Sequence, residues 1–188
     1  LIEAESQQMA ENAKREIDAI PLTGGTRHFF SREAIEAVFK RDLPQRSAPE
    51  VGQTYAAGGD TGFTKNSGAL TILGTPTAAK AGAGRVRLAL IEERVPKPGS
   101  PLQPEAVAEE FAGLMLPYGL RELVVDGHER ERVGKALNDK GASAVAAPPK
   151  PDAFSKLRTI IHDGRLDAPE HPRLRQQLRD VMVRPLPG

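Results

Sequence analysis

Residues 53–74, QTYAAGGDTGFTKNSGALTILG, contain the pattern that decides the fold. A β-rich run over 53–59 leads into Asp60, and an apolar run over 68–74 follows after a short segment rich in Gly and Thr. A third β-rich run covers residues 85–95. Because the connecting segments are short and rich in turn-forming residues, the sequence predicts three antiparallel strands joined by hairpins.

Helical and strand-like patterns alternate after the third strand. Helices are predicted near 104–116, 129–140, 152–163 (capped by Asp152) and 172–179, and strands near 120–125, 143–147 and 180–184. Three hairpin-linked strands followed by helix-linked strands are typical of a mixed sheet. We therefore expect an α/β fold in which a mixed sheet of five or more strands is flanked by helices.

The first fifty residues have a different organisation. Residues 1–22 show the spacing of an amphipathic helix, and a second helix is predicted to begin after Ser31 as its N-cap. Residues 41–52 read as a connector. This pattern predicts a helical linker over 1–50 and a compact domain over 51–188, cut from a longer protein.

Composition excludes several classes of function. The 188 residues contain no cysteine, which excludes disulfides, zinc–thiolate sites and a cysteine nucleophile. No apolar run approaches the roughly 20 residues of a membrane-spanning helix. The net charge is only +1, so the overall charge does not by itself indicate a nucleic-acid-binding protein. No Walker-type phosphate loop occurs, and this chain alone therefore cannot power translocation with ATP.

Asp60 is the first candidate functional residue, because it lies where an apolar strand leaves the sheet. Glycines at positions 58, 59 and 62 leave room for a group to approach the backbone closely. A carboxylate in this position is a suitable ligand for a hard divalent cation, which prefers oxygen donors. The alternative interpretation is an aspartate that closes a hairpin turn.

Asp126 is the second candidate, and it follows the buried-looking strand 123–125. If the first and fourth strands are parallel neighbours, Asp60 and Asp126 lie together at one rim of the sheet. Two carboxylates held close are unfavourable without a cation between them. The pair therefore predicts a Mg²⁺ or Mn²⁺ site, with two metal ions for phosphodiester hydrolysis. The alternative for Asp126 is an N-cap of the helix over 129–140, which the intervening Gly127 and His128 disfavour.

Further residues carry weaker signals. His128 and Glu129 are possible auxiliary ligands, or a loop histidine and a first-turn acid of the helix. One of Glu92 and Glu93 faces the predicted site, although surface pairing with Arg87 or Arg94 is the simpler interpretation. Contacts with the DNA backbone are assigned to Lys65, Lys156, Arg158, Arg173, Arg175 and Arg179. Acidic residues are interspersed among them, so a solvated helix face remains the alternative.

Several segments in order resemble the nuclease domain of a tailed-bacteriophage terminase large subunit. They are GGDTGFTKNSGALTIL (58–73), LRELVVDGHERERVGKALNDKG (120–141) and FSKLRTIIHDGRLDAPEHPRLRQQLRDV (154–181). The stretch TRHFFSREAIEAVFK (26–40) is similar to the link between the packaging ATPase and the nuclease in that family.

This resemblance implies an RNase H-like fold and a metal-dependent endonuclease that cuts concatemeric double-stranded DNA. It matches Asp60 and Asp126 to two catalytic, metal-binding acids, and a third acid is expected beyond Gly188. Magnesium or manganese would be the cofactor. The expected partners are double-stranded DNA, an upstream ATPase domain, the capsid portal and the small terminase subunit, in the host cytoplasm and not at a membrane.

Two other functions remain compatible with the sequence. The chain could be a DNA- or portal-docking module of the packaging motor without catalysis. In addition, residues 59–65, GDTGFTK, resemble the first phosphate loop of actin-like sugar kinases. Those kinases need a second domain with a Gly-rich adenosine segment, and nothing after residue 120 supplies one.

Overall fold

The computed structural model of the chain describes residues 27–61, 67–78 and 84–183, without the side chains of Arg27 and Glu129. These residues belong to two compact units. The smaller unit includes strand β1 (Arg27–His28), which pairs antiparallel with β9 (Met182–Val183). The larger unit spans Phe30 to Asp180 and contains a seven-stranded sheet. The helix predicted over residues 1–22 lies outside the described residues.

The sheet of the larger unit has the strand order β2-β8-β5-β4-β3-β6-β7. Its strands are β2 (Phe39–Lys40), β3 (Gln53–Asp60), β4 (Gly68–Pro76), β5 (Val86–Arg94), β6 (Glu122–Val125), β7 (Ser143–Ala146) and β8 (Leu166–Pro169). Strand β4 is antiparallel to both of its neighbours, and all other neighbouring pairs are parallel. The other six strands therefore end at one edge of the sheet, called the carboxyl edge below.

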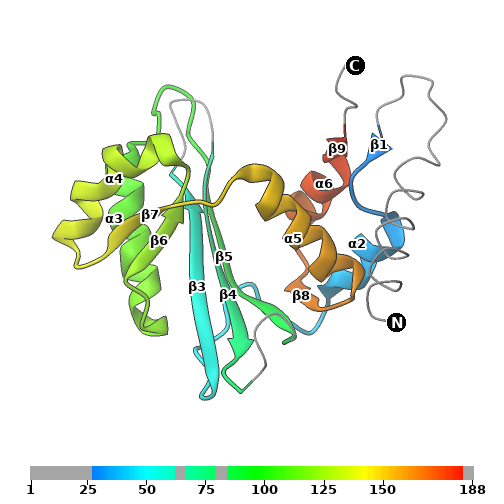
Figure 1. Cartoon of the computed structure of the whole chain (residues 1–188). Coiled ribbons are helices and arrows are strands. Elements are labelled where there is room, and N and C mark those ends of the chain that lie inside the picture. Colours follow the sequence, from blue (N-terminus) through cyan, green and yellow to red (C-terminus); the bar gives the residue numbers. More distant parts are fainter. Residues whose placement is uncertain (1–26, 62–66, 79–83, 184–188) are drawn as a thin grey trace, which may run out of the picture. The chain divides into compact units, whose positions relative to one another are not determined.

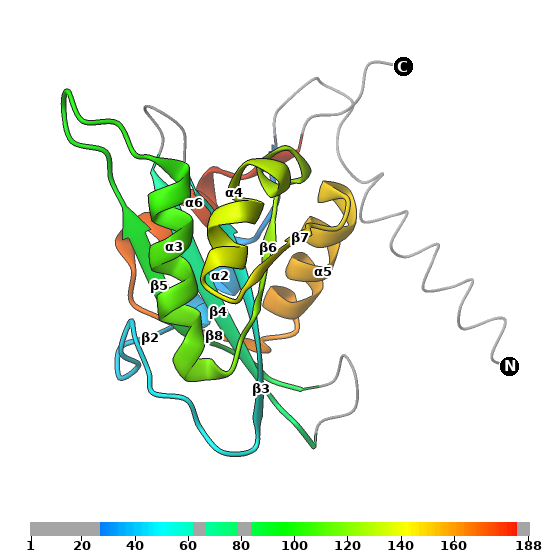
Figure 2. The ribbon, with the colours of Figure 1, turned by 90° about the vertical axis from the view of Figure 1, so that its left-hand side faces the viewer.

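Helices cover both faces of this sheet. They are α2 (Arg32–Val38), α3 (Pro104–Met115), α4 (Gly127–Asp139), α5 (Lys150–His162) and α6 (Pro172–Asp180), and the short 3-10 helix η1 (Leu116–Tyr118) follows α3. Helices α3 and α4 lie on one face, and α2, α5 and α6 lie on the other (Figures 1 and 2). Within the described residues, no helix has the length and apolar character that crossing a membrane requires.

The observed architecture confirms the expected α/β fold with a mixed sheet. The three hairpin strands, α3, β6, β7 and α6 occur where the sequence predicts them. Helix α4 begins at Gly127, earlier than the predicted 129, so Asp126 does occupy its N-cap position. The Asp126 side chain nevertheless makes no capping hydrogen bond. Helix α5 is capped by Pro149 instead of Asp152, which lies in the first turn.

The segment before β3 is part of the larger unit. Ser31 caps α2 as predicted, because its Oγ accepts a hydrogen bond from the backbone N–H of Ala34 at 3.2 Å. Strand β2 follows directly and pairs with β8 at the edge of the sheet. The predicted division of the chain between residues 50 and 51 into a linker and a domain stays a prediction.

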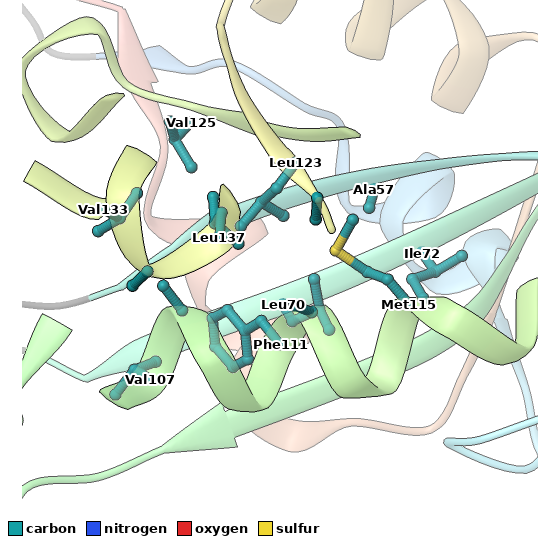
Figure 3. Packing of buried hydrophobic residues seen from close by; sticks show 14 of the residues in the cluster. Ala57, Leu70, Ile72, Val107, Phe111, Met115, Leu123, Val125, Val133 and Leu137 are labelled. Carbon is teal, nitrogen blue, oxygen red and sulfur yellow. The ribbon is translucent and has the colours of Figure 1, made fainter. Parts of the chain in front are cut away.

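The main core lies between the sheet and helices α3 and α4. Figure 3 shows Phe111 and Met115 of α3 packed against Leu70 and Ile72 of β4, with Leu123 of β6 above them. All five side chains are fully buried. Since apolar burial drives folding, this layer fixes β6 against β3 and β4 and thereby positions the ends of these strands.

Truncating the central leucine of this layer is expected to destabilise the protein strongly. We predict that Leu123→Ala lowers the free energy of unfolding by about 2–5 kcal/mol, because it removes buried methyl groups and leaves a cavity. Chemical denaturation measures the change. Leu116→Ala is the control, since Leu116 is 52% exposed; an equal loss in both variants would contradict this account of the core.

Two cations contact one carboxylate in the part of the sheet formed by β2, β8 and β5. Arg85 precedes β5 and donates to both carboxylate oxygens of Asp167 on β8, with Nε–Oδ2 at 2.5 Å and Nη2–Oδ1 at 3.1 Å. Lys40 of β2 lies 3.7 Å from the same carboxylate. The hydrogen bond from Arg85 lowers the pKa of Asp167 below its ordinary value, against the opposing effect of burial.

This lowered pKa predicts a pH-dependent contribution to stability. The charged form of Asp167 is favoured in the folded state, so its contribution is full above the unfolded pKa of about 3.9 and disappears as the pH falls through the lower folded pKa. Asp167→Asn should therefore be less stable than the parent at neutral pH. In denaturation at a series of pH values the difference should shrink below about pH 4; a constant difference would contradict the prediction.

Candidate functional site

Asp60 and Asp126 lie opposite each other at the carboxyl edge. Strand β3 pairs with β6 in parallel, with Ala57 opposite Leu123 and Gly58 opposite Val124. The same register, continued along both strands, places Asp60 opposite Asp126. Side chains alternate between the faces of a sheet, so both aspartates share the face of Gly58 and Val124, away from the α3–α4 core. Neighbouring strands are about 4.8 Å apart, which makes these carboxylates close neighbours.

The two glycines directly before Asp60 have different surroundings, and only Gly59 is closely packed. A Cβ at Gly59 would lie 3.1 Å from Cδ1 of Leu123 and 3.4 Å from the carbonyl oxygen of Ala69. Gly59 therefore allows β3 and β6 to approach each other over the buried Leu123. At Gly58, on the face of Asp60, a Cβ would meet only Thr71 Oγ1 at an ordinary 3.7 Å. At Gly59 the group that approaches the backbone closely is the Leu123 side chain, and Gly62 lies outside the described residues.

A third carboxylate, Glu93, extends the row of Asp60 and Asp126. Ala69 on β4 is paired with Asp60 on one side and with Glu93 of β5 on the other. Asp60, Ala69 and Glu93 therefore share one face of the sheet. The neighbouring Glu92 belongs to the opposite face by alternation, and Arg94 binds it together with Glu110 of α3. The sequence indicated that one of the two glutamates faces the site. The register places Glu93 on the face of Asp60, and Glu92 also contributes to the lining of the cavity described next.

An open cavity of about 480 Å³ lies in front of this row. Its walls come from the end of β3, the start of β4, the end of β5 and the first turns of α6. The lining residues are Asp60, Ser67, Ala69, Ile91, Glu92, Glu93, His171, Arg173, Leu174 and Gln177. Asp126 is not among them. The cavity thus combines carboxylates of the sheet with cationic and polar groups of α6, at the edge where ligands bind in open α/β sheets.

Cationic side chains accompany both outer carboxylates of the row. Lys150, the first residue of α5, places Nζ 3.1 Å from Oδ2 of Asp126. Arg173 of α6 forms an ion pair with Glu93. The Lys150 side chain is 74% exposed and that of Arg173 49% exposed, so water screens both pairs. These cations offset the repulsion between neighbouring carboxylates in the chain without metal.

Two other arginines of α6 hold the helix to the rest of the fold. Arg175 binds Glu36 of α2 and Glu170, and its guanidinium lies 4.3 Å from the ring centroid of Phe39. Arg179 binds the same Glu36 carboxylate. The hydrogen bond from Arg179 is the largest cause of the lowered pKa of Glu36. Neither arginine lines the cavity. Their predicted contact with DNA therefore stays a prediction, and their ion pairs within the fold are the alternative role.

Of the remaining predicted residues whose side chains the structure describes, none lines the cavity. His128 is exposed near the start of α4, and Lys156 and Arg158 are exposed on α5. The side chain of Glu129 is not described, and Lys65 lies outside the described residues. His171 is a cavity residue that the sequence analysis missed. Its Nδ1 accepts a hydrogen bond from the backbone N–H of Leu174 at 3.1 Å and so caps the start of α6.

The donor set suits a hard divalent cation only in part. Asp60, Asp126 and Glu93 offer carboxylate oxygens, which Mg²⁺ and Mn²⁺ prefer. In the part of the chain that the structure describes, no group of three or more His, Asp or Glu side chains is close enough to hold a metal ion. By register, Asp60 and Asp126 are neighbouring carboxylates, with Glu93 across Ala69 as a more distant acid.

Comparison with solved structures identifies the fold. The large terminase of bacteriophage HK97 superimposes with a TM-score of 0.63 at 16% identity, covering 85% of this chain. The large terminase nuclease of the thermophilic phage G20c, solved with bound magnesium, has a TM-score of 0.63 at 16% identity and covers 89% of this chain. The nuclease domain of the P22 large terminase has a TM-score of 0.53 at 16% identity and covers 81%.

The shares of the compared chains show which part is similar. This chain spans 92% of the G20c nuclease and 77% of the P22 nuclease domain, but only 37% of the HK97 large terminase. No family model and no curated protein matches the sequence. At these identities the likeness concerns the fold: the chain has the RNase H-like fold of phage large terminase nucleases, as the sequence predicts.

The contacts of Arg175 predict a test of how α6 is held. We expect Arg175→Ala to lower the free energy of unfolding by about 1–3 kcal/mol, because it removes charge-assisted hydrogen bonds and a cation–π contact. Thermal denaturation measures the loss. Arg132→Ala is the control, since Arg132 forms an ion pair with Glu105 on the α3–α4 side at 3.3 Å. Equal losses would show that Arg175 contributes no more than a surface pair.

Proposed function

We propose that this chain is the nuclease part of a phage large terminase and a divalent-metal-dependent endonuclease. Its substrate would be concatemeric double-stranded DNA, cut in the host cytoplasm during genome packaging. The observation that carries the proposal is the parallel register of β3 and β6, which brings Asp60 and Asp126 together at the carboxyl edge. The likeness in fold to terminase nucleases supports it.

In this proposal Asp60 and Asp126 hold Mg²⁺ or Mn²⁺. The metal, when bound, would supply Lewis-acid activation of water and charge stabilisation at the cleaved phosphodiester. Asp60 is exposed on the cavity and accessible to the DNA backbone. Lys150 has to leave Asp126 when a cation takes its place, and its largely exposed side chain can do so at little cost.

The same proposal includes partners from the rest of the DNA-packaging motor. The chain spans 37% of the HK97 large terminase, which leaves room in a protein of that size for a packaging ATPase domain. Contacts with such a domain, the capsid portal and the small terminase subunit belong to this proposal. A docking module without catalysis is the competing function, and the absence of a three-ligand group from the described residues favours testing it directly.

A plasmid-nicking assay with Mg²⁺ or Mn²⁺ tests the nuclease function. We predict that Asp60→Asn and Asp126→Asn each reduce the cutting rate by at least about 100-fold. Substitution of a residue that only supports a metal ligand typically lowers activity by about 10- to 100-fold, and loss of the ligand itself should lower it at least as much. EDTA should abolish cutting by the parent. Asp139→Asn is the matched control, since Asp139 ends α4, the helix that begins beside Asp126.

Binding of Mn²⁺, followed by electron paramagnetic resonance, gives a second measurement. Both site variants should bind the ion more weakly than the parent and the Asp139 variant. DNA binding without metal-dependent cutting would favour the docking module over the nuclease. Cutting that survives both site substitutions would remove Asp60 and Asp126 from the proposed site.

A further inference from the structure

We propose that Arg173 binds a DNA phosphate in the cavity beside Asp60. This inference rests on the proposed nuclease function and deepens it, because it names the group that would receive the substrate backbone next to the carboxylates. Of the α6 arginines, Arg173 is the one that lines the cavity. The sequence placed it in a general basic patch, without distinguishing it from Arg175 or Arg179.

Helix geometry separates the arginines of α6 by function. Successive residues of an α-helix are about 100° apart, so Arg173 and Arg175 point in nearly opposite directions. Arg175 and Arg179 differ by about 40° and share Glu36 as a partner. Gln177 lies one turn after Arg173 and lines the same cavity. The face of α6 with Arg173 and Gln177 therefore lines the cavity, and the face with Arg175 and Arg179 attaches the helix to α2.

Glu93 holds the Arg173 guanidinium at the cavity. Their ion pair links the first turn of α6 to the end of β5, and Ala69 separates Glu93 from Asp60 on the same face. An arginine has five N–H donors in a planar fork. The contact with Glu93 is made by Nη1, so a phosphate can bind the same guanidinium without loss of the pair.

Electrostatics gives a reason for an arginine in this place. A phosphodiester that enters the cavity beside Asp60 and Glu93 meets like charges, and that repulsion has to be offset before chemistry can occur. Phosphate contacts by arginine position nucleic acid without reading its sequence. Arg173 lines the cavity next to Glu93, and its side chain is 49% exposed, so it is accessible to a large substrate.

Equilibrium binding of a fluorescent DNA duplex to the 188-residue chain in EDTA tests this inference without cutting. We expect Arg173→Ala to weaken binding about tenfold at moderate salt and to reduce the slope of log affinity against log salt by about one. Arg173→Lys should keep the slope and lose only about two- to threefold, because it retains the charge. Arg132→Ala, in an ion pair on the α3–α4 side, should bind like the parent.

Each result supports or overturns the role of Arg173. Parent-like affinity and salt slope in Arg173→Ala would overturn it, as would an equal loss in Arg132→Ala or no DNA binding by the parent. If Arg173→Ala fails the circular-dichroism test of folding, Arg173→Gln and Arg173→Lys are compared in its place. Weakened binding by Arg173→Ala in a chain that never cuts DNA would retain this inference and reject the nuclease. Unchanged DNA binding by Arg173→Ala, together with metal-dependent cutting by the parent, would reject this inference and retain the nuclease.

Discussion

The parallel pairing of β3 with β6 is the constraint on which the candidate site depends. These strands are separated by more than sixty residues of sequence, and their register alone places Asp60 opposite Asp126. Leu123 contributes to this register, since it is fully buried and packs tightly over Gly59, where a Cβ would lie 3.1 Å from its Cδ1. A shift by one residue would move both the leucine and the aspartate to the wrong faces. Packing on one face of the sheet thus positions acids on the other.

Ion pairs between helices and strands are a second feature of the carboxyl edge, and packing of the core does not explain them. Asp126 and Glu93 each pair with a cation from the start of a different helix, Lys150 of α5 and Arg173 of α6. Exposed pairs of this kind contribute little to stability, so their value to the fold is small. They do keep positive charge beside a row of acids.

The sequence predicts the elements with strong patterns, and the structure confirms most of them. It misses β2 and β8, because a two-residue strand has no periodicity and the four residues of β8 include a proline. Asp60 and Asp126 are identified because each follows a recognisable strand. The ion pair of Arg173 with Glu93 is not predictable in this way, since the two residues lie far apart in the sequence. Only the order of strands in the sheet brings them together.

The small side chain of Ala69 contributes to the shape of the cavity. It lies between Asp60 and Glu93 in the register, on the face that lines the cavity. A larger side chain there would fill the space that the two acids share. Composition also conceals this arrangement, because a net charge of +1 says nothing about which acidic and basic groups the fold brings together. Recognition of a phosphate backbone depends on local charge, and of the three α6 arginines only Arg173 lines the cavity.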